Sequence, residues 1–280
     1  MKIGIFTCGY QRNPIEHIFE DAVRFGYDYV ELWGGRPHAY AYDLRAGDIY
    51  EIKRLIEKYE MPVEVFCPEH NAYPYNYMIG SEAQRQDAVK YLKVCMDMAK
   101  EMGASYTLIS AGHAGYNTPQ TEIWKRFIYT VRELTDYAER IGHKLIIEPL
   151  TPYENNVCVS IADVERLFEA VHSPNLVTML DTVAAFSCGD NMMAYFDKLG
   201  DKVDHIHLID GVLGSDSHMV PGTGDIPLES FIYELQEINY QKTATIELVT
   251  NYLNEPRLYA KKAIDNVRTM METVRLTRKK

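Results

Sequence analysis

The sequence lacks several features that would assign it to particular classes of protein. It has no apolar run of about 18 residues, the length of a membrane-spanning helix, and Met1-Lys2-Ile3 leads directly into a strand-like segment. We therefore expect neither a membrane span nor a signal peptide. The five cysteines are odd in number and form no C-x-x-C pair, so we expect reduced thiols in a cytoplasmic protein.

Basic residues are also scarce. The chain has 29 Lys and Arg against 40 Asp and Glu, a net charge of −11 over 280 residues. Nucleic acids and anionic membranes bind basic surfaces, so we expect neither as a partner. The composition, 46% hydrophobic and 25% charged, is ordinary for a globular enzyme. Because no linker or low-complexity segment interrupts the chain, we expect one domain over residues 1–280.

What the chain does contain is a regular alternation of strand-like and helix-like segments. Helix-start chemistry occurs at Asn13-Pro14, Ser81, Ser160 and Asn254. Eight strand–helix units predict an α/β fold, a closed (β/α)8 TIM barrel, with an open doubly wound sheet as the second choice. The strand candidates are 2–7, 27–33, 62–67, 104–110, 143–149, 175–181, 203–210 and 242–249.

Acidic residues and a histidine collect at the C-terminal ends of the later strands, where a barrel carries its chemistry. Because side chains alternate along a strand, we expect one inward face to gather four of them. They lie at the ends of the fifth to eighth strands: Glu148, Asp181, His207 and Glu247.

Three ionised carboxylates cannot share a pocket without a counter-charge, and no Lys or Arg within these strands lies near the tips. A divalent cation would supply the charge. Oxygen ligands with one imidazole suit Mn²⁺, Mg²⁺, Co²⁺, Ni²⁺ or Zn²⁺ without choosing among them. One acid alone is more simply a helix cap or a solvated loop residue, but the four residues together indicate a metal site.

The same alternation turns Glu31 and Trp33 inward on the second strand. His205 lies one pleat deeper than His207, where we expect a spacer or a residue that supports the ligands.

Three loops lie on the same rim of the expected barrel. "SAGHAGYNTP" places His113 among small residues that let a ligand approach, although a plain turn histidine is an equal alternative. "HMVPGTGDIPLESF", which includes His218, has no Lys or Arg, so we expect a tight turn rather than a phosphate site. The aromatic loop "PEHNAYPYNYMIG" is a candidate for covering a substrate or for pairing copies in a homo-oligomer.

The order of Glu148, Asp181, His207, "PGTGDIP" and Glu247 resembles the xylose-isomerase-like barrel superfamily of sugar isomerases and epimerases, along essentially the whole chain. Loops such as "FTCGYQRNPIEHIF", "ELWGGRPHAYAYDL" and "EPLTPYENN" resemble its ketose 3-epimerase branch, and within it the fructoselysine 3-epimerases, which interconvert fructoselysine and psicoselysine. The resemblance implies a metal-dependent isomerase that removes and returns the C3 proton of a sugar or sugar–amine through a metal-stabilised enediolate.

The resemblance also implies roles for individual residues. The metal ligands would be Glu148, Asp181, His207 and Glu247, with Glu148 and Glu247 also acting as the catalytic acid–base pair. Glu154 would contact the substrate. Further substrate-binding candidates are Trp33, His113 and His218.

Two substrate contacts of the free-ketose epimerases are absent. Ala184 stands where a histidine is expected and Leu213 where an arginine is expected, which leaves His218 or His113 to take over. This departure agrees with a ketoamine that carries a large substituent at C1. The alternatives are an aldose–ketose isomerase, a free ketohexose 3-epimerase, an inosose dehydratase and a non-catalytic sugar-binding protein.

Overall fold

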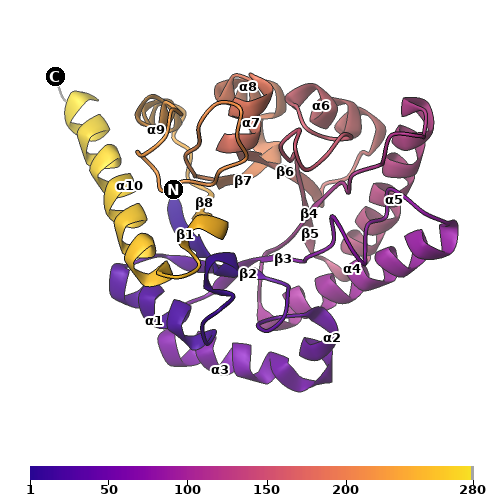
Figure 1. Ribbon diagram of the computed structural model, residues 1–280, viewed down its shortest axis with the longest axis horizontal. Coiled ribbons are helices and arrows are strands. Elements are labelled where there is room, and N and C mark those ends of the chain that lie inside the picture. Colours follow the sequence, from indigo (N-terminus) through magenta and orange to yellow (C-terminus); the bar gives the residue numbers. More distant parts are fainter. Residues whose placement is uncertain (279–280) are drawn as a thin grey trace.

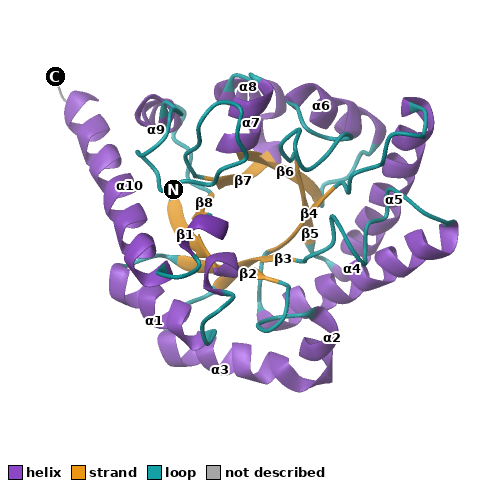
Figure 2. Cartoon of the chain, viewed as in Figure 1, coloured by secondary structure: helices purple, strands orange, loops and turns teal. Residues whose placement is uncertain are grey.

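A closed ring of parallel strands forms the centre of the molecule, and helices surround it (Figures 1 and 2). The computed structural model describes residues 1–278. The strands pair in sequence order, and the ring closes where the first strand pairs with the last, with Ile5 opposite Ile246. The predicted (β/α)8 barrel is therefore confirmed.

All eight predicted strands are present, each shorter than predicted by one to four residues, and the last two differ most. The seventh ends at His207 and the eighth at Ile246, so Glu247 lies one residue beyond its strand. The strands are β1 (Lys2–Phe6), β2 (Tyr29–Trp33), β3 (Val63–Cys67), β4 (Tyr106–Ser110), β5 (Lys144–Glu148), β6 (Leu176–Asp181), β7 (Val203–His207) and β8 (Thr243–Ile246).

Two of the four predicted helix starts, Ser81 and Ser160, cap their helices as expected, and the last helix begins at Pro256, two residues after the predicted start at Asn254. Ser81 and Ser160 each form a reciprocal capping box, with Gln84 and Asp163 respectively. The expected cap at Asn13 is wrong, because Asn13 belongs to a turn, donating to the carbonyl of Tyr10, before the helix starts at Glu16. The helices are α1 (Glu16–Phe25), α2 (Ala41–Asp43), α3 (Ile49–Tyr59), α4 (Glu82–Met102), α5 (Gln120–Ile141), α6 (Ile161–Ala170), α7 (Thr182–Cys188), α8 (Met192–Leu199), α9 (Leu228–Glu237) and α10 (Pro256–Arg278). Within residues 1–278, none of them has the length and apolar character to cross a membrane.

The apolar core has two parts, one on each side of the strands. A large part fills the space between strands and helices and includes Leu145 and Ile147. A small part fills the barrel interior, and each such buried side chain stabilises the fold by about 1.5–3 kcal/mol. Its members are Val65, Leu108, Ile146, Val177 and Met179. This interior layer supports the strand ends from which the predicted site residues project.

Candidate active site

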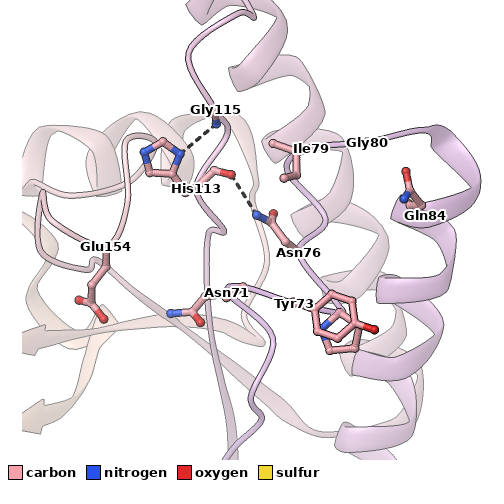
Figure 3. Close-up of a pocket in the computed structure, with 11 residues that line it drawn as sticks. Asn71, Tyr73, Asn76, Ile79, Gly80, Gln84, His113, Gly115 and Glu154 are labelled. Atoms are coloured by element: carbon pink, nitrogen blue, oxygen red, sulfur yellow. Dashed lines mark hydrogen bonds between the residues drawn. The ribbon is translucent and has the colours of Figure 1, made fainter. Parts of the chain in front are cut away.

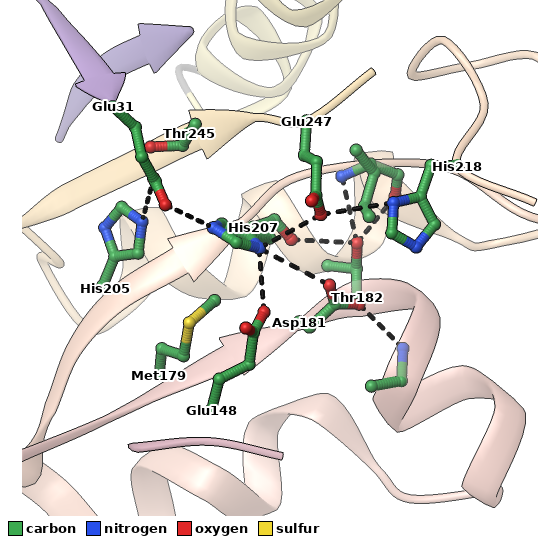
Figure 4. A network of polar contacts seen from close by, with 12 residues as sticks. Glu31, Glu148, Met179, Asp181, Thr182, His205, His207, His218, Thr245 and Glu247 are labelled. Atoms are coloured by element: carbon green, nitrogen blue, oxygen red, sulfur yellow. Dashed lines mark hydrogen bonds and ion pairs between the residues drawn. The ribbon is translucent and has the colours of Figure 1, made fainter. Parts of the chain in front are cut away.

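The four predicted ligands meet at the C-terminal end of the barrel (Figure 4). His207 is central: its Nδ1 lies 3.0 Å from Glu148 Oε1, 3.2 Å from Glu247 Oε2 and 3.7 Å from Asp181 Oδ2. All four side chains are buried or nearly so. The sequence therefore predicted correctly which residues come together here.

The surroundings of these acids fit a cation. Although three carboxylate oxygens surround it, the buried Nδ1 of His207 makes no hydrogen bond. Among residues 1–278, the ion-pair partners of the three acids are histidines alone. Donor atoms of Glu148, Asp181 and His207 lie within 4.8 Å of one another, a spacing that one metal ion could bridge.

Asp181 divides its two oxygens between two tasks. It ends β6 and caps α7, where its Oδ1 accepts a hydrogen bond of 2.7 Å from the N–H of Ala184. Its Oδ2 stays directed toward His207. Asp181 can therefore be both a helix cap and a metal ligand, because each role uses a different oxygen.

Glu31 on β2 binds the other ring nitrogen of His207, Nε2, a role that the sequence alone did not suggest. It is fully buried and accepts hydrogen bonds from His205 Nε2 at 3.0 Å and from His207 Nε2 at 3.2 Å. A histidine that donates through Nε2 leaves Nδ1 free for a metal ion. The inward position of Glu31 on its strand was the only signal in the sequence, since its partners lie some 170 residues away.

The electrostatics of the cluster follow from burial and from this crowding. Burial opposes the charged form of His207, yet Glu31, Glu247 and Glu148 raise its pKa well above the ordinary value. Burial raises the pKa of Glu148 to about 7 against the opposing effect of His207. Burial acts on Glu247 too, but His218 and His207 hold its pKa well below the ordinary value. The site carries more acid than its histidines can neutralise.

Three of the four predicted substrate-binding residues, Glu154, Trp33 and His113, line two neighbouring cavities, and His218 lines neither. A cavity of about 260 Å³ above the acids, which we call the acid cavity, is lined by Glu148, Glu247, Glu154 and Trp33 among others. His113 lies apart from it, in a larger cavity of about 600 Å³ that also contains Glu154 (Figure 3).

His218 and Trp33 are both held in place beside the acids. His218 Nδ1 lies 3.2 Å from Glu247 Oε2, and His218, Asp181 and Glu247 form a second group that could hold a metal ion. Burial would lower the pKa of His218, but Glu247, Asp181 and Asp216 raise it to about 10. Trp33 donates from its indole N–H to Glu69 Oε2 at 3.0 Å.

The glycine-rich loop after β7 wraps around its own carboxylate. Asp210 accepts hydrogen bonds from the backbone N–H groups of Gly211, Gly222, Gly224 and Ile226, at 2.9–3.1 Å. A Cβ atom added to Gly224 would lie 2.5 Å from Asp210 Oδ1, which explains the glycine there. These N–H groups bind a carboxylate of the protein itself, which agrees with the turn that the sequence favoured over a phosphate site.

The two departures from the free-ketose pattern have different surroundings. Ala184 is buried in the first turn of α7, whereas Leu213 is 73% exposed. Among the described residues that line the two cavities, there is no lysine or arginine. Neither cavity therefore has a strong cationic group for a negatively charged substrate.

Fold and site together define a (β/α)8 barrel with a buried acid–histidine centre at its strand ends. The sequence model of the xylose isomerase-like TIM barrel family matches residues 19–270, and the chain belongs to that family. Over 271 residues the chain is 51% identical to the fructoselysine 3-epimerase of Escherichia coli O157:H7, an alignment that covers 97% of this chain and 98% of that protein. The predicted family is therefore confirmed.

Solved structures show the same fold at lower identity. A D-tagatose 3-epimerase-like protein superposes with a TM-score of 0.84 at 20% identity, covering 99% of both chains. The IOLI protein, solved with a zinc atom, superposes with a TM-score of 0.81 at 19% identity, covering 98% of this chain and 99% of that one.

Proposed function

We propose that this chain is a divalent-metal-dependent ketose 3-epimerase that interconverts fructoselysine and psicoselysine. One structural observation carries the proposal: Glu148 and Glu247 approach the same nitrogen of His207, Nδ1. Glu148 ends β5 and Glu247 follows β8, and β6 and β7 lie between these two strands in the ring. The near full-length identity to a fructoselysine 3-epimerase supports the choice of reaction and substrate.

The residues that would hold the metal ion are Glu148, Asp181, His207 and Glu247. They fit such an ion, because the Nδ1 atom of His207 has no hydrogen bond and the acids have no lysine or arginine beside them among the described residues. Mn²⁺, Mg²⁺, Co²⁺, Ni²⁺ and Zn²⁺ all accept this ligand set. When bound, the ion supplies Lewis-acid stabilisation of negative charge on the substrate oxygens, a contribution of several kcal/mol.

The protein side chains supply the proton transfers. The proton on C3, next to the ketone at C2, is only weakly acidic. One glutamate removes this proton and leaves an enediolate, and the other returns a proton to the opposite face, which inverts the carbon. Each positioned acid or base of this kind contributes about 10²–10⁴-fold to the rate. Glu148 and Glu247 fit these roles because each reaches the acid cavity from its own side of the ring.

Two residues expected to contact a free ketose are absent from this chain. Ala184 and Leu213 replace the histidine and arginine expected for a free ketose, so two substrate contacts of that class of enzyme are missing. A ketoamine carries an amine substituent at C1 in place of the hydroxyl of a free ketose. The open space beside Glu154 leaves room for such a substituent.

Deuterium exchange in ²H₂O, followed by NMR, tests the proposal. With fructoselysine and Mn²⁺ we expect deuterium at C3, and no incorporation after the metal is removed. Glu148→Gln and Glu247→Gln should abolish the exchange, whereas Glu165→Gln, on the surface of α6, should retain it. Label confined to C1 or C2 would indicate an aldose–ketose isomerase, and absence of exchange with fructoselysine, fructose and psicose would refute the epimerase.

A further inference from the structure

The larger of the two cavities extends the acid cavity away from the metal ligands. It has a volume of about 600 Å³, against about 260 Å³ for the acid cavity, and the two share Asn71 and Glu154 as a common wall. We call it the arm cavity. Its other walls come from the loops after β3 and β4 and from the start of α4, including Tyr73, Ile79 and Gln84 (Figure 3).

Glu154 stands at the junction of the two cavities without a lysine or arginine partner among the described residues, and the nearby His218 favours its ionised form. Its Oε2 accepts a hydrogen bond of 3.1 Å from the hydroxyl of Thr151, and no Lys or Arg in residues 1–278 pairs with it. Burial raises the pKa of Glu154 to about 8, and the charges of Asp216 and Glu148 act in the same direction. A carboxylate in such surroundings is stabilised by a positive charge on a ligand.

The walls of the arm cavity beyond Glu154 present hydrogen-bond donors. His113 Nδ1 accepts from the N–H of Gly115 at 3.0 Å, so the neutral ring carries its proton on Nε2, which has no acceptor among the described residues. Gln84 Oε1 accepts from the N–H of Ser81 at 2.7 Å, which leaves the amide NH₂ of Gln84 available. Figure 3 shows Glu154 and Gln84 at opposite sides of the cavity.

The wall between these ends is partly apolar and open. Tyr73 is 92% exposed and Ile79 is 47% exposed, although both line the cavity. Exposed apolar side chains on a cavity wall are positions where an aliphatic chain can be buried on binding.

The geometry points to the arm cavity as the subsite for the amino-acid arm of a ketoamine, an inference that rests on the proposed function. The secondary ammonium beside C1 pairs with Glu154, the methylene chain packs on Tyr73 and Ile79, and the α-carboxylate accepts hydrogen bonds from Gln84. From the ammonium nitrogen to the carboxylate carbon an extended lysine side chain measures roughly 7 Å. A sphere of 600 Å³ is about 10 Å across, so the arm fits in an extended form.

Calorimetric binding to the Mn²⁺-loaded protein tests this subsite with three probes. Fructoselysine carries the complete arm, the ketoamine of fructose with n-pentylamine carries only the ammonium and the chain, and fructose carries neither. We expect Kd to rise about tenfold from the first to the second, which lacks the α-carboxylate and the α-ammonium, and about tenfold again to the third, which lacks the secondary ammonium and the chain.

Variants test which residue is responsible for each of the two expected increases in Kd. Gln84→Ala should bring the affinities of fructoselysine and the pentylamine ketoamine closer together, and Glu154→Gln should do so for the pentylamine ketoamine and fructose. Gln86→Ala is the matched control, because Gln86 lies on the same helix and donates to Glu82 outside the cavity. Both ratios should be unchanged in that variant.

The binding and deuterium-exchange experiments distinguish failure of the arm-cavity proposal from failure of the epimerase proposal. Equal affinity of the wild-type protein for all three probes, within twofold, would overturn the arm cavity whatever the exchange assay shows. If the Kd ratios between the probes stayed at their wild-type values in Gln84→Ala and Glu154→Gln, the arm would bind elsewhere, which would also overturn the arm-cavity proposal. Discrimination in binding without deuterium exchange at C3 would support the arm cavity and refute the epimerase.

Discussion

Glu31 is the residue whose replacement tests most directly how His207 is oriented. Its carboxylate receives two hydrogen bonds, from His205 and His207, in a position with no access to solvent. Burial opposes its ionisation, but His207 and His205 lower the pKa of Glu31 to about 2, so it is ionised at neutral pH. Loss of a group that orients a metal-binding histidine reduces metal affinity by about 10–100-fold, or about 1.4–2.8 kcal/mol.

The two available substitutions should differ. In Glu31→Gln the amide oxygen can accept from one histidine only, while the amide NH₂ faces the other. His205 can adapt by moving its proton to Nδ1, since the Thr243 hydroxyl 2.8 Å away can accept it. His207 cannot adapt in this way without losing the nitrogen that faces the acids. We therefore expect about a tenfold loss of Mn²⁺ affinity in Glu31→Gln and about a hundredfold loss in Glu31→Ala.

Titration of metal-free protein with Mn²⁺, followed by calorimetry, measures both losses. Asp21→Asn is the matched control, because Asp21 is an equally buried acid that binds Tyr10 and Arg257 away from the site. It should lower the unfolding temperature without changing Mn²⁺ affinity. The reasoning would be refuted if Glu31→Ala bound Mn²⁺ within twofold of the wild-type protein.

Three further predictions concern the stability of the barrel and its loops. Removing the metal ion should lower the unfolding temperature by about 5 °C or more relative to protein with Mn²⁺ at 100 times its Kd, since such binding adds about 2.7 kcal/mol; an unchanged melting curve would contradict a metal site. Asp210→Ala removes the acceptor of four backbone N–H groups, so limited proteolysis should cut residues 211–226 faster than in the wild-type protein, and equal rates would argue against this anchoring role. Asp204 is buried and binds Lys144 and Lys242 at 2.8 and 2.6 Å, so Asp204→Asn should cost about 1–3 kcal/mol in denaturant unfolding at pH 7. Burial opposes the charge of Asp204, but the two lysines lower its pKa. The stability lost in Asp204→Asn should therefore be present above the unfolded pKa near 4 and should shrink as the pH falls below it. A stability loss that did not depend on pH would contradict this role of the ionised carboxylate.

The parts of the fold and site that depend on local pattern could be predicted from the sequence. Short strand-like runs predicted each strand, and period-two alternation put Glu148, Asp181 and His207 on one inward face, because adjacent strands of a parallel barrel end at the same rim. The end of β8 was less predictable: Glu247 continues the alternation but lies outside the strand pairing.

Features that depend on distant partners could not be predicted in this way. The two hydrogen bonds of Glu31 join β2 to β7, and no local pattern reports which strands face each other across a closed ring. The arm cavity arises from two loops and a helix start, whose relative positions depend on packing rather than on periodicity. The failed cap at Asn13 has a simpler cause, since the same residue types favour turns as well as helix starts.

The contact between Glu31 and His207 also links the assembly of the site to the order of folding. Glu31 comes from the second strand and His207 from the seventh, so a nascent or truncated chain that lacks one of them cannot orient the imidazole. Contacts of such long sequence separation form late, because the loop between them must be closed first. Metal capture by a fully oriented histidine would therefore follow ring closure, and the rate of Mn²⁺ uptake during refolding would report when the barrel closes.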